Sequence, residues 1–480
     1  MAQAIAIGQP FSPKIPQVRF RRTRRDHDPG TNGAVAGSGA RGWRALGVGD
    51  EATYRLPTMT IGRLLHALAR RIASATGVVL ALAASAGAQE TASPALTASA
   101  RETLDLWDVA SGGVRRGATV LSKLQLSATA RGDPIGDRGG ALHVQLFRTD
   151  GSSLSARVGD IQTVSNIEAP AVTRLFEAWV EQHVGRGGAV AVRAGLMDLN
   201  ADFDPLETSA LFVNSSHGIG PDIARSGRNG PSIFPVSSLG LRTEWQASDR
   251  VTLHVAAFDG VPGDPDRPRA FAAVRLGHGD GALLIGQADY RFPGEVKLEV
   301  GGWGYTGAAA SDTVGRARTR DRGAYASLEG PLSGRWSAWL RAGIARADAQ
   351  AVSGYLGGGA ILKGLLRARR EDQLGLAVAH AVISPTARRL DGLPPAETTV
   401  EATYQARAGR LLAVQPDLQW VRHPAAAPGV RNAVVIGLRL VLVAGYPDDA
   451  PTPSSVDPTV SPEGPQPVTH EGPTPHTRPE

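Results

Sequence analysis

The stretch RAGLMDLNADFD, residues 193–204, places oxygen-bearing side chains at every second position. Asp198, Asn200, Asp202 and Asp204 offer carboxylate and amide oxygens in this pattern. Such oxygens can ligate a calcium ion, line a polar passage or terminate a strand with a turn. The spacing alone leaves these three chemistries open, so the surrounding elements must decide among them.

A calcium-binding EF-hand loop is the first alternative. Such a loop begins Asp-x-Asp/Asn-x-Asp/Asn-Gly and supplies a bidentate Glu at its twelfth position. Here Phe203 occupies the glycine position and Ser209 occupies the position of that Glu. Residues 193–199 also have the pattern of an extended segment rather than a flanking helix. We therefore predict no metal site and no cofactor, and interpret the stretch as a strand followed by a polar turn.

The charge of the 480-residue chain is unevenly distributed. Residues 1–88 carry 12 basic and 4 acidic groups, residues 89–446 carry 38 and 35, and residues 447–480 carry 1 and 6. Because the central region is nearly balanced and has no basic patch interleaved with aromatics, no nucleic-acid partner is predicted. The chain has no cysteine, which excludes disulfides, thiolate metal sites and cysteine nucleophiles.

An export signal is predicted well inside the chain. A basic segment that ends at Arg71 precedes an apolar run over residues 72–84, which is shorter than a membrane-spanning helix requires. Ala86-Gly87-Ala88 then provides a small-residue cleavage site. Met59 opens this unit, so we expect a signal peptide over residues 59–88 and export of the remainder.

The central region shows alternation with a period of two residues. In LLAVQPDLQWV (411–421), Val414, Pro416, Leu418 and Trp420 share one face, and Gln415, Asp417 and Gln419 share the other. Such alternation indicates strands with one apolar and one polar face. Fourteen segments have this pattern: 118–130, 140–149, 173–184, 189–197, 236–246, 249–258, 281–292, 294–305, 322–330, 335–346, 370–382, 396–407, 411–421 and 431–443.

The length and polarity of these segments favour a membrane barrel over a soluble sandwich. A transmembrane β-strand needs about 9–11 residues, with apolar side chains facing lipid and polar side chains facing a lumen. The polar faces here carry charges, which a packed soluble core rarely tolerates. We therefore predict an all-β fold, a transmembrane antiparallel β-barrel with a polar lumen.

Several long strings of residues resemble one family. They are VSNIEAP (164–170), RAGLMDLNADFD (193–204), LFVNSSHGIGPDIARSGRNGPSIFPVSSLGLR (211–242), GGWGYTG (301–307) and VQPDLQWVRHP (414–424). They are similar, in the same order, to the carbohydrate-selective porins of the OprB type. The resemblance covers roughly residues 100–445 and implies one barrel of about sixteen strands. It also implies passive passage of sugars such as glucose across the bacterial outer membrane.

The resemblance and the alternation together divide the chain into four regions. They are an N-terminal extension, disordered or preceding the true start, over 1–58; the signal peptide, 59–88; the porin barrel, 89–446; and a disordered Pro-rich tail, 447–480. The last strand ends near Tyr446 rather than at the chain terminus, where the barrel assembly machinery ordinarily reads an aromatic residue. The other expected partners are a carbohydrate solute, outer-membrane lipid and, in a homo-oligomer, further copies of the chain.

Polar side chains on the inward faces are the candidates for contact with the sugar. Carboxylates, amides and guanidiniums can hydrogen-bond the hydroxyls of a sugar, and a channel requires that this binding be weak. The candidates are Glu177, Glu181, Arg193, Asp198, Asn200, Asp202, Gln415, Asp417 and Gln419. For each of them the alternative is a wall residue without solute contact.

Other functions remain as alternatives. A general pore for other solutes and a secreted glycan-binding β-protein both fit alternating strands. An outer-membrane enzyme fits poorly, because Asn214-Ser215-Ser216-His217 holds triad residue types only as chain neighbours. The chain also lacks a Gly-x-Ser-x-Gly elbow and a His-Glu-x-x-His zinc motif. We therefore predict a channel rather than an enzyme.

Overall fold

A computed structural model describes residues 96–132, 139–272, 274–277, 279–307 and 320–446. The N-terminal extension, the signal peptide and the Pro-rich tail that the sequence predicts therefore lie outside the described residues.

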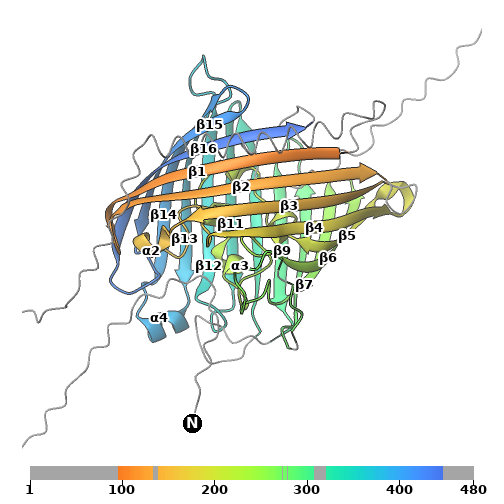
Figure 1. The fold of residues 1–480 in the computed structure, drawn as a ribbon, viewed down its shortest axis with the longest axis horizontal. Helices are drawn as coiled ribbons and strands as arrows, with labels where there is room; N and C mark the ends of the chain where they lie inside the picture. Colours follow the sequence, from red (N-terminus) through yellow and green to blue (C-terminus); the bar gives the residue numbers. More distant parts are fainter. Residues whose placement is uncertain (1–95, 133–138, 273, 278, 308–319, 447–480) are drawn as a thin grey trace, which may run out of the picture. The chain divides into compact units, whose positions relative to one another are not determined.

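The described chain forms a closed barrel of sixteen antiparallel strands, in which each strand pairs with the next and β1 pairs with β16 (Figure 1). This confirms the predicted fold class and strand number. The strands are β1 (Leu96–Gly113), β2 (Gly117–Gly132), β3 (Gly140–Gly151), β4 (Val172–Val184), β5 (Val190–Met197), β6 (Ser238–Ser248), β7 (Val251–Asp259), β8 (Ala282–Arg291), β9 (Lys297–Tyr305), β10 (Arg322–Ser333), β11 (Trp336–Ala345), β12 (Val352–Lys363), β13 (Gln373–Ile383), β14 (Ala396–Ala408), β15 (Leu412–Arg422) and β16 (Arg431–Tyr446).

Short helices interrupt the connections between strands. They are α2 (Ser155–Val158), α3 (Pro221–Ala224) and α4 (Pro385–Asp391), with the 3₁₀ turns η1 (Arg186–Gly188), η2 (Leu199–Ala201), η3 (Thr208–Leu211) and η4 (Ser215–His217). Among the described residues, no helix combines the length and the apolar character needed to cross a membrane.

The connections are short at one end of the barrel and long at the other. At the end where β1 begins and β16 ends, residues 249–250 and 334–335 form two-residue turns. At the opposite end, residues 152–171 join β3 to β4 and residues 198–237 join β5 to β6. Short turns on the periplasmic side and long loops on the external side are typical of outer-membrane barrels. We accordingly call the long-loop end the external end.

The outward face of the wall is apolar and exposed. Ile344, Leu376 and Ile436 are exposed by 67%, 58% and 52%, respectively. Large apolar side chains exposed in this number form a band that water would not favour, whereas lipid would cover it. The alternation therefore places the apolar residues of the strands toward the membrane and the polar residues toward the lumen.

The sequence analysis did not predict two of the sixteen strands, β1 and β12. The outward face of β1 is interrupted by Glu102 and Asp108, and the centre of β12 consists of Gly357, Gly358 and Gly359. Both strands pair with their neighbours over most of their length. Backbone pairing with the neighbouring strand on each side therefore forms a strand even where the apolar alternation is too weak to predict one.

Two long connections fold into the lumen. We call residues 152–171 the first inner segment and residues 198–237 the second inner segment. Within the second, Leu199, Phe203 and Ile223 are completely buried. Both segments form hydrogen bonds with inward-facing wall residues that are distant in the sequence. The two inner segments therefore narrow the lumen of the barrel.

Candidate solute pathway

A cavity of about 820 Å³ runs between the barrel wall and the two inner segments. β2, β3 and β4 contribute Lys123, Gln125, Gln145 and Glu177 to its lining. The inner segments contribute, among others, Asn166, Glu168, Asp198, Asn200 and Phe234. β14, β15 and β16 contribute Gln405, Gln415 and Arg439. The cavity therefore offers amides and both signs of charge, which suits a polyhydroxylated solute.

The stretch at 198–204 begins where β5 ends, as predicted, and its four polar residues separate into two pairs. Asp198 and Asn200 line the cavity, and the Asp198 carboxylate accepts a hydrogen bond of 3.0 Å from the Asn200 N–H. Asp202 and Asp204 are instead buried against arginines of the wall. The 3₁₀ turn η2 interrupts the extended backbone that follows β5. Side chains at every second position therefore no longer point to the same face.

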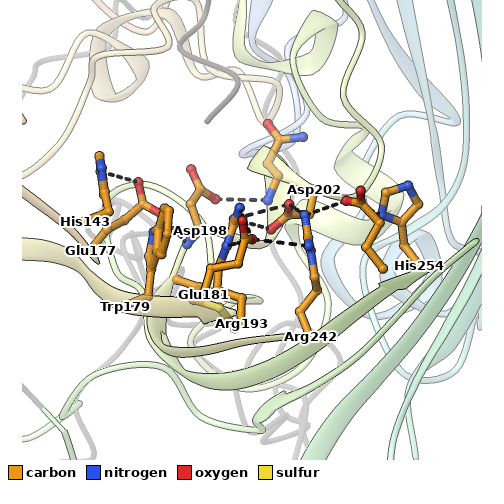
Figure 2. Close-up of polar contacts among 12 residues, drawn as sticks. His143, Glu177, Trp179, Glu181, Arg193, Asp198, Asp202, Arg242 and His254 are labelled. Carbon is orange, nitrogen blue, oxygen red and sulfur yellow. Dashed lines mark hydrogen bonds and ion pairs between the residues drawn. The ribbon is translucent and has the colours of Figure 1, made fainter. Parts of the chain in front are cut away.

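A buried ion cluster joins the turn to the wall (Figure 2). It consists of Glu181, Arg193, Asp202 and Arg242. The Arg193 Nη2 atom lies 2.8 Å from Glu181 Oε2, and Arg193 Nη1 lies 3.0 Å from Asp202 Oδ2. The Arg242 Nη2 atom donates to Asp202 Oδ1 over 2.5 Å. The Arg193 guanidinium also stacks on Trp179, with Cζ 4.0 Å from the ring centroid. None of the four lines the cavity, so the cluster fixes the second inner segment to β4, β5 and β6.

The pKa values of the two acidic residues in this turn shift in opposite directions. Burial alone would raise the pKa of Asp202, but the Arg193 and Arg242 guanidiniums outweigh it and lower that pKa. Burial raises the pKa of Asp198 to about 7, although the Asn200 N–H and the Lys123 ammonium partly offset the shift. Asp198 therefore carries a titratable carboxyl into the cavity, whereas Asp202 remains ionised in its cluster.

Two of the three predicted residues of β15 attach the inner segments to the wall, and the third, Asp417, holds one of them. Gln415 Nε2 donates to the Leu211 carbonyl over 2.7 Å, and Gln419 Nε2 donates to the Val164 carbonyl over 2.9 Å. Asp417 accepts a hydrogen bond of 3.1 Å from Gln419. Of the three, only Gln415 also lines the cavity.

Wall glutamates outside the predicted set bind backbone N–H groups of the inner segments. Glu401 accepts from the N–H groups of Val213 and Asn214 over 2.6 and 3.0 Å. Glu397 accepts from residues 161, 162 and 425 over 2.7–3.1 Å. A carboxylate satisfies two adjacent N–H donors through strong, charge-assisted hydrogen bonds. The alternation of inward-facing and outward-facing residues along the strand could have identified these glutamates as polar residues of the inner wall. No local sequence pattern predicts the N–H groups that they bind.

A second buried ion cluster lies on β11. The Arg341 guanidinium, which is 1% exposed, binds both Asp204 and Asp222 of the second inner segment. Arg341 Nη2 lies 2.9 Å from Asp204 Oδ2. A Cβ atom on Gly343 would lie 2.1 Å from Asp222 Oδ2, so glycine leaves the space that this pair occupies.

Lys123 faces the pathway without an ion-pair or hydrogen-bond partner among the described residues. Its ammonium lies 4.3 Å from the ring centroid of Phe234 on the second inner segment, at a distance that allows a cation–π contact. Sequence reasoning missed Lys123, although its alternation with Gln125 on β2 was a usable signal. No local pattern could have predicted the contact with Phe234.

The family model of the carbohydrate-selective porins, OprB family, matches residues 115–442, which is more than half of the chain. The chain belongs to this family. No curated protein matches it. The porin therefore resides in the bacterial outer membrane and forms a channel for carbohydrates rather than an enzyme.

Solved structures agree with this assignment at the level of the fold. The high-pH structure of Pseudomonas putida OprB is 18% identical, covers 73% of this porin and 94% of that chain, and gives a TM-score of 0.64. The channel DcaP of Acinetobacter baumannii is 10% identical, covers 73% and 96%, and gives a TM-score of 0.48. At these identities the likeness concerns the barrel alone, and only the first comparison supports it.

Proposed function

We propose that this porin binds sugars weakly within the cavity during passive passage. The observation that carries the proposal is the placement of a free ammonium, Lys123, in the same cavity as Asp198, Asn200 and Gln145. These groups donate to and accept from hydroxyls in several directions. The mixed charges favour a neutral solute, and the few contacts allow the solute to leave.

The nine residues predicted from the sequence take two roles in this proposal. Glu177, Asp198, Asn200 and Gln415 line the cavity and contact the solute. The other five act indirectly, because they belong to the ion cluster and hydrogen bonds that hold the inner segments, with Asp417 acting through Gln419. These five are Glu181, Arg193, Asp202, Asp417 and Gln419.

Single-channel conductance in a planar bilayer tests the proposal, with glucose and other neutral sugars titrated in. We expect open steps that sugar blocks on the order of millimolar concentrations, because conduction requires weak binding. Lys123→Gln and Asp198→Asn are each expected to weaken this block about three- to tenfold by removing one charged hydrogen-bonding group. Asp249→Asn, in an exposed periplasmic turn, is the matched control and leaves the block unchanged.

Two outcomes would contradict the proposal. Open steps that no sugar blocks would indicate a general pore, in which the lining residues are only wall. If a folded preparation forms no channel and remains soluble without detergent, the secreted glycan-binding alternative replaces the porin.

The proposed partners beyond the solute follow from the barrel. The apolar outward face requires lipid, and the barrel closes only where β16 pairs with β1. We infer that the barrel assembly machinery inserts the chain and that copies associate as a homo-oligomer. Native mass spectrometry of the detergent-extracted porin measures that oligomeric state.

A further inference from the structure

Six exposed arginines gather in one sector of the external end. We call Arg115, Arg116, Arg388, Arg389, Arg422 and Arg431 the arginine rim. They lie in the β1–β2 turn, on α4, at the end of β15 and at the start of β16. α4 is at the lower left of Figure 1, on the same end of the barrel as α2.

Backbone contacts hold the parts of the rim together. The N–H groups of Val114 and Arg115 donate to the Arg157 carbonyl over 2.8 and 2.9 Å, and the Ala426 N–H donates to the Gly159 carbonyl over 2.9 Å. The first inner segment therefore joins the β1–β2 turn to the β15–β16 loop. Because neighbouring strands lie about 4.8 Å apart, Arg422, Arg431 and Arg115 are within a few strand spacings of one another.

The α4 arginines belong to the same surface. A Cβ atom on Gly392, the residue that ends α4, would lie 3.8 Å from the Pro428 Cβ atom of the β15–β16 loop. The helix thus packs beside that loop. Arg388 and Arg389 are both exposed in the last turn of α4.

The rim arginines form no ion pair within the part of the chain that the structure describes. Residues 113–117, 384–395 and 422–432 contain six arginines and one acidic residue, Asp391. In the β7–β8 loop, residues 260–281, three arginines accompany three aspartates. The positive charge of the rim is therefore neither balanced by composition nor neutralised by contact.

Three arginines elsewhere on the external end are paired with aspartates. Arg346 Nη2 lies 2.9 Å from Asp348, Arg267 Nε lies 2.8 Å from Asp264, and Arg275 Nη1 lies 2.6 Å from Asp266. The rim differs from these sites in that it gathers, in one sector of the external end, six arginines without an aspartate partner among the described residues.

The rim adjoins the membrane-facing band. Arg422 points outward two residues beyond Trp420 and four beyond Leu418, which are exposed by 41% and 46%. Beside Arg422, the outward-facing His380 and Thr398 hydrogen-bond each other over 2.8 Å and replace apolar residues. This change from apolar to polar side chains marks the level where the lipid headgroups begin.

We propose that the arginine rim binds the phosphate groups of lipids in the outer leaflet. Guanidinium forks match phosphate oxygens in two-point hydrogen bonds, and basic clusters at a membrane interface recruit anionic headgroups. The position of Arg422 directly above an apolar band suits a phosphate that is attached to acyl chains. A free phosphate ion would gain nothing from that band. The rim is separate from the sugar pathway, so this inference does not rest on the proposed sugar binding.

The test measures binding of the detergent-purified porin to phosphatidylcholine vesicles that contain diphosphoryl or monophosphoryl lipid A. Chelator is present so that divalent cations cannot bridge the contacts. We expect the native porin to prefer diphosphoryl lipid A, and expect Arg115→Gln/Arg116→Gln/Arg422→Gln/Arg431→Gln to weaken its binding at least about tenfold. Single-channel conductance and the heat-dependent gel mobility of the same variant report that the barrel is folded.

Three controls give the experiment its specificity. Arg267→Gln/Arg275→Gln/Arg346→Gln removes paired arginines from the same end and is expected to leave binding unchanged. Arg388→Gln/Arg389→Gln, outside the barrel wall, is expected to weaken binding about threefold and stays informative if the four-site variant fails to fold. The proposal is overturned by equal binding of native and rim variants, by an equal loss in the paired-arginine control, or by pyrophosphate binding as tightly as lipid A.

Discussion

At the scale of single residues, two aspartates four positions apart have different surroundings. Asp202 lies between Arg193 and Arg242, which lower its pKa despite burial. Asp198 lines the cavity, and burial raises its pKa from 3.8 to about 7. Glu168, also in the cavity lining, has its pKa raised by burial from 4.5 to about 7. Residue type and spacing are therefore a poor guide to charge state, which depends on the nearest guanidinium.

We expect the ion selectivity of the porin to change near pH 7. Below this pH the carboxyls of Asp198 and Glu168 are neutral, and above it they add negative charge to the pathway. The cation-to-anion permeability ratio should therefore rise between pH 5 and pH 9, as measured from the reversal potential in a salt gradient. Asp198→Asn/Glu168→Gln should abolish most of the rise, and Asp249→Asn should retain it.

The raised pKa values of Asp198 and Glu168 also predict how the folding stability of the porin depends on pH. Because the folded protein keeps protons that the unfolded chain releases between about pH 4 and pH 7, the contribution of these groups to folding is lost as pH rises through 7. A selectivity that is flat from pH 5 to pH 9 would contradict the titration of these two carboxyls within that range.

At the scale of elements, the strands were predictable and the inner segments were not. Fourteen strands are predictable from apolar alternation. Lipid on one side and a polar lumen on the other impose this alternation on each strand separately. β12 lacks the signal because Gly359 makes room for Trp339, whose Nε1 atom would lie 2.9 Å from a Cβ there. The inner segments have no such periodicity. Wall carboxylates hold their backbone in place, and this does not require side chains to alternate between two faces.

Glu397→Gln should loosen the first inner segment without opening the barrel. The carboxylate accepts from three backbone N–H groups, whereas a glutamine amide offers one oxygen and turns an N–H₂ group toward donors. We expect a loss of roughly 2 kcal/mol or more in local stability. Trypsin should then cleave after Arg157 faster than in the native porin.

The exposed Glu371 provides the control for this cleavage, since Glu371→Gln alters a periplasmic turn and no inner segment. Equal cleavage rates for native porin and Glu397→Gln would show that the segment is held by other contacts. Measured unfolding temperatures of both variants separate a local change from a global one.

At the scale of the whole molecule, closure between β1 and β16 decides stability. Ala98 pairs with Tyr446 and Leu104 pairs with Leu440, so paired residues that are 348 and 336 positions apart in the sequence complete the ring. In a bilayer an unpaired strand edge leaves N–H and C=O groups without partners, which costs several kcal/mol for each group. The barrel therefore assembles as one cooperative unit that needs both of its end strands.

A chain of residues 89–446 should refold with the conductance of residues 89–480, because β16 is complete at Tyr446. A chain that ends at residue 430 lacks β16 and should form no barrel. The measurement is the shift in gel mobility of unheated against heated samples, together with conductance. Failure of residues 89–446 to give the folded mobility would show that assembly requires the segment beyond Tyr446.

The sequence by itself determined the wall of this protein, its polar lumen and its family, because each strand meets lipid and lumen independently and its alternation records both. The tertiary structure decided which inward residues face the solute. Two inner segments cover part of the wall, and Glu401 meets Val213 across 188 residues of sequence. Such contacts depend on barrel register, which no local pattern encodes. For the same reason the six arginines of the rim, scattered over the sequence, form one surface only after the barrel closes.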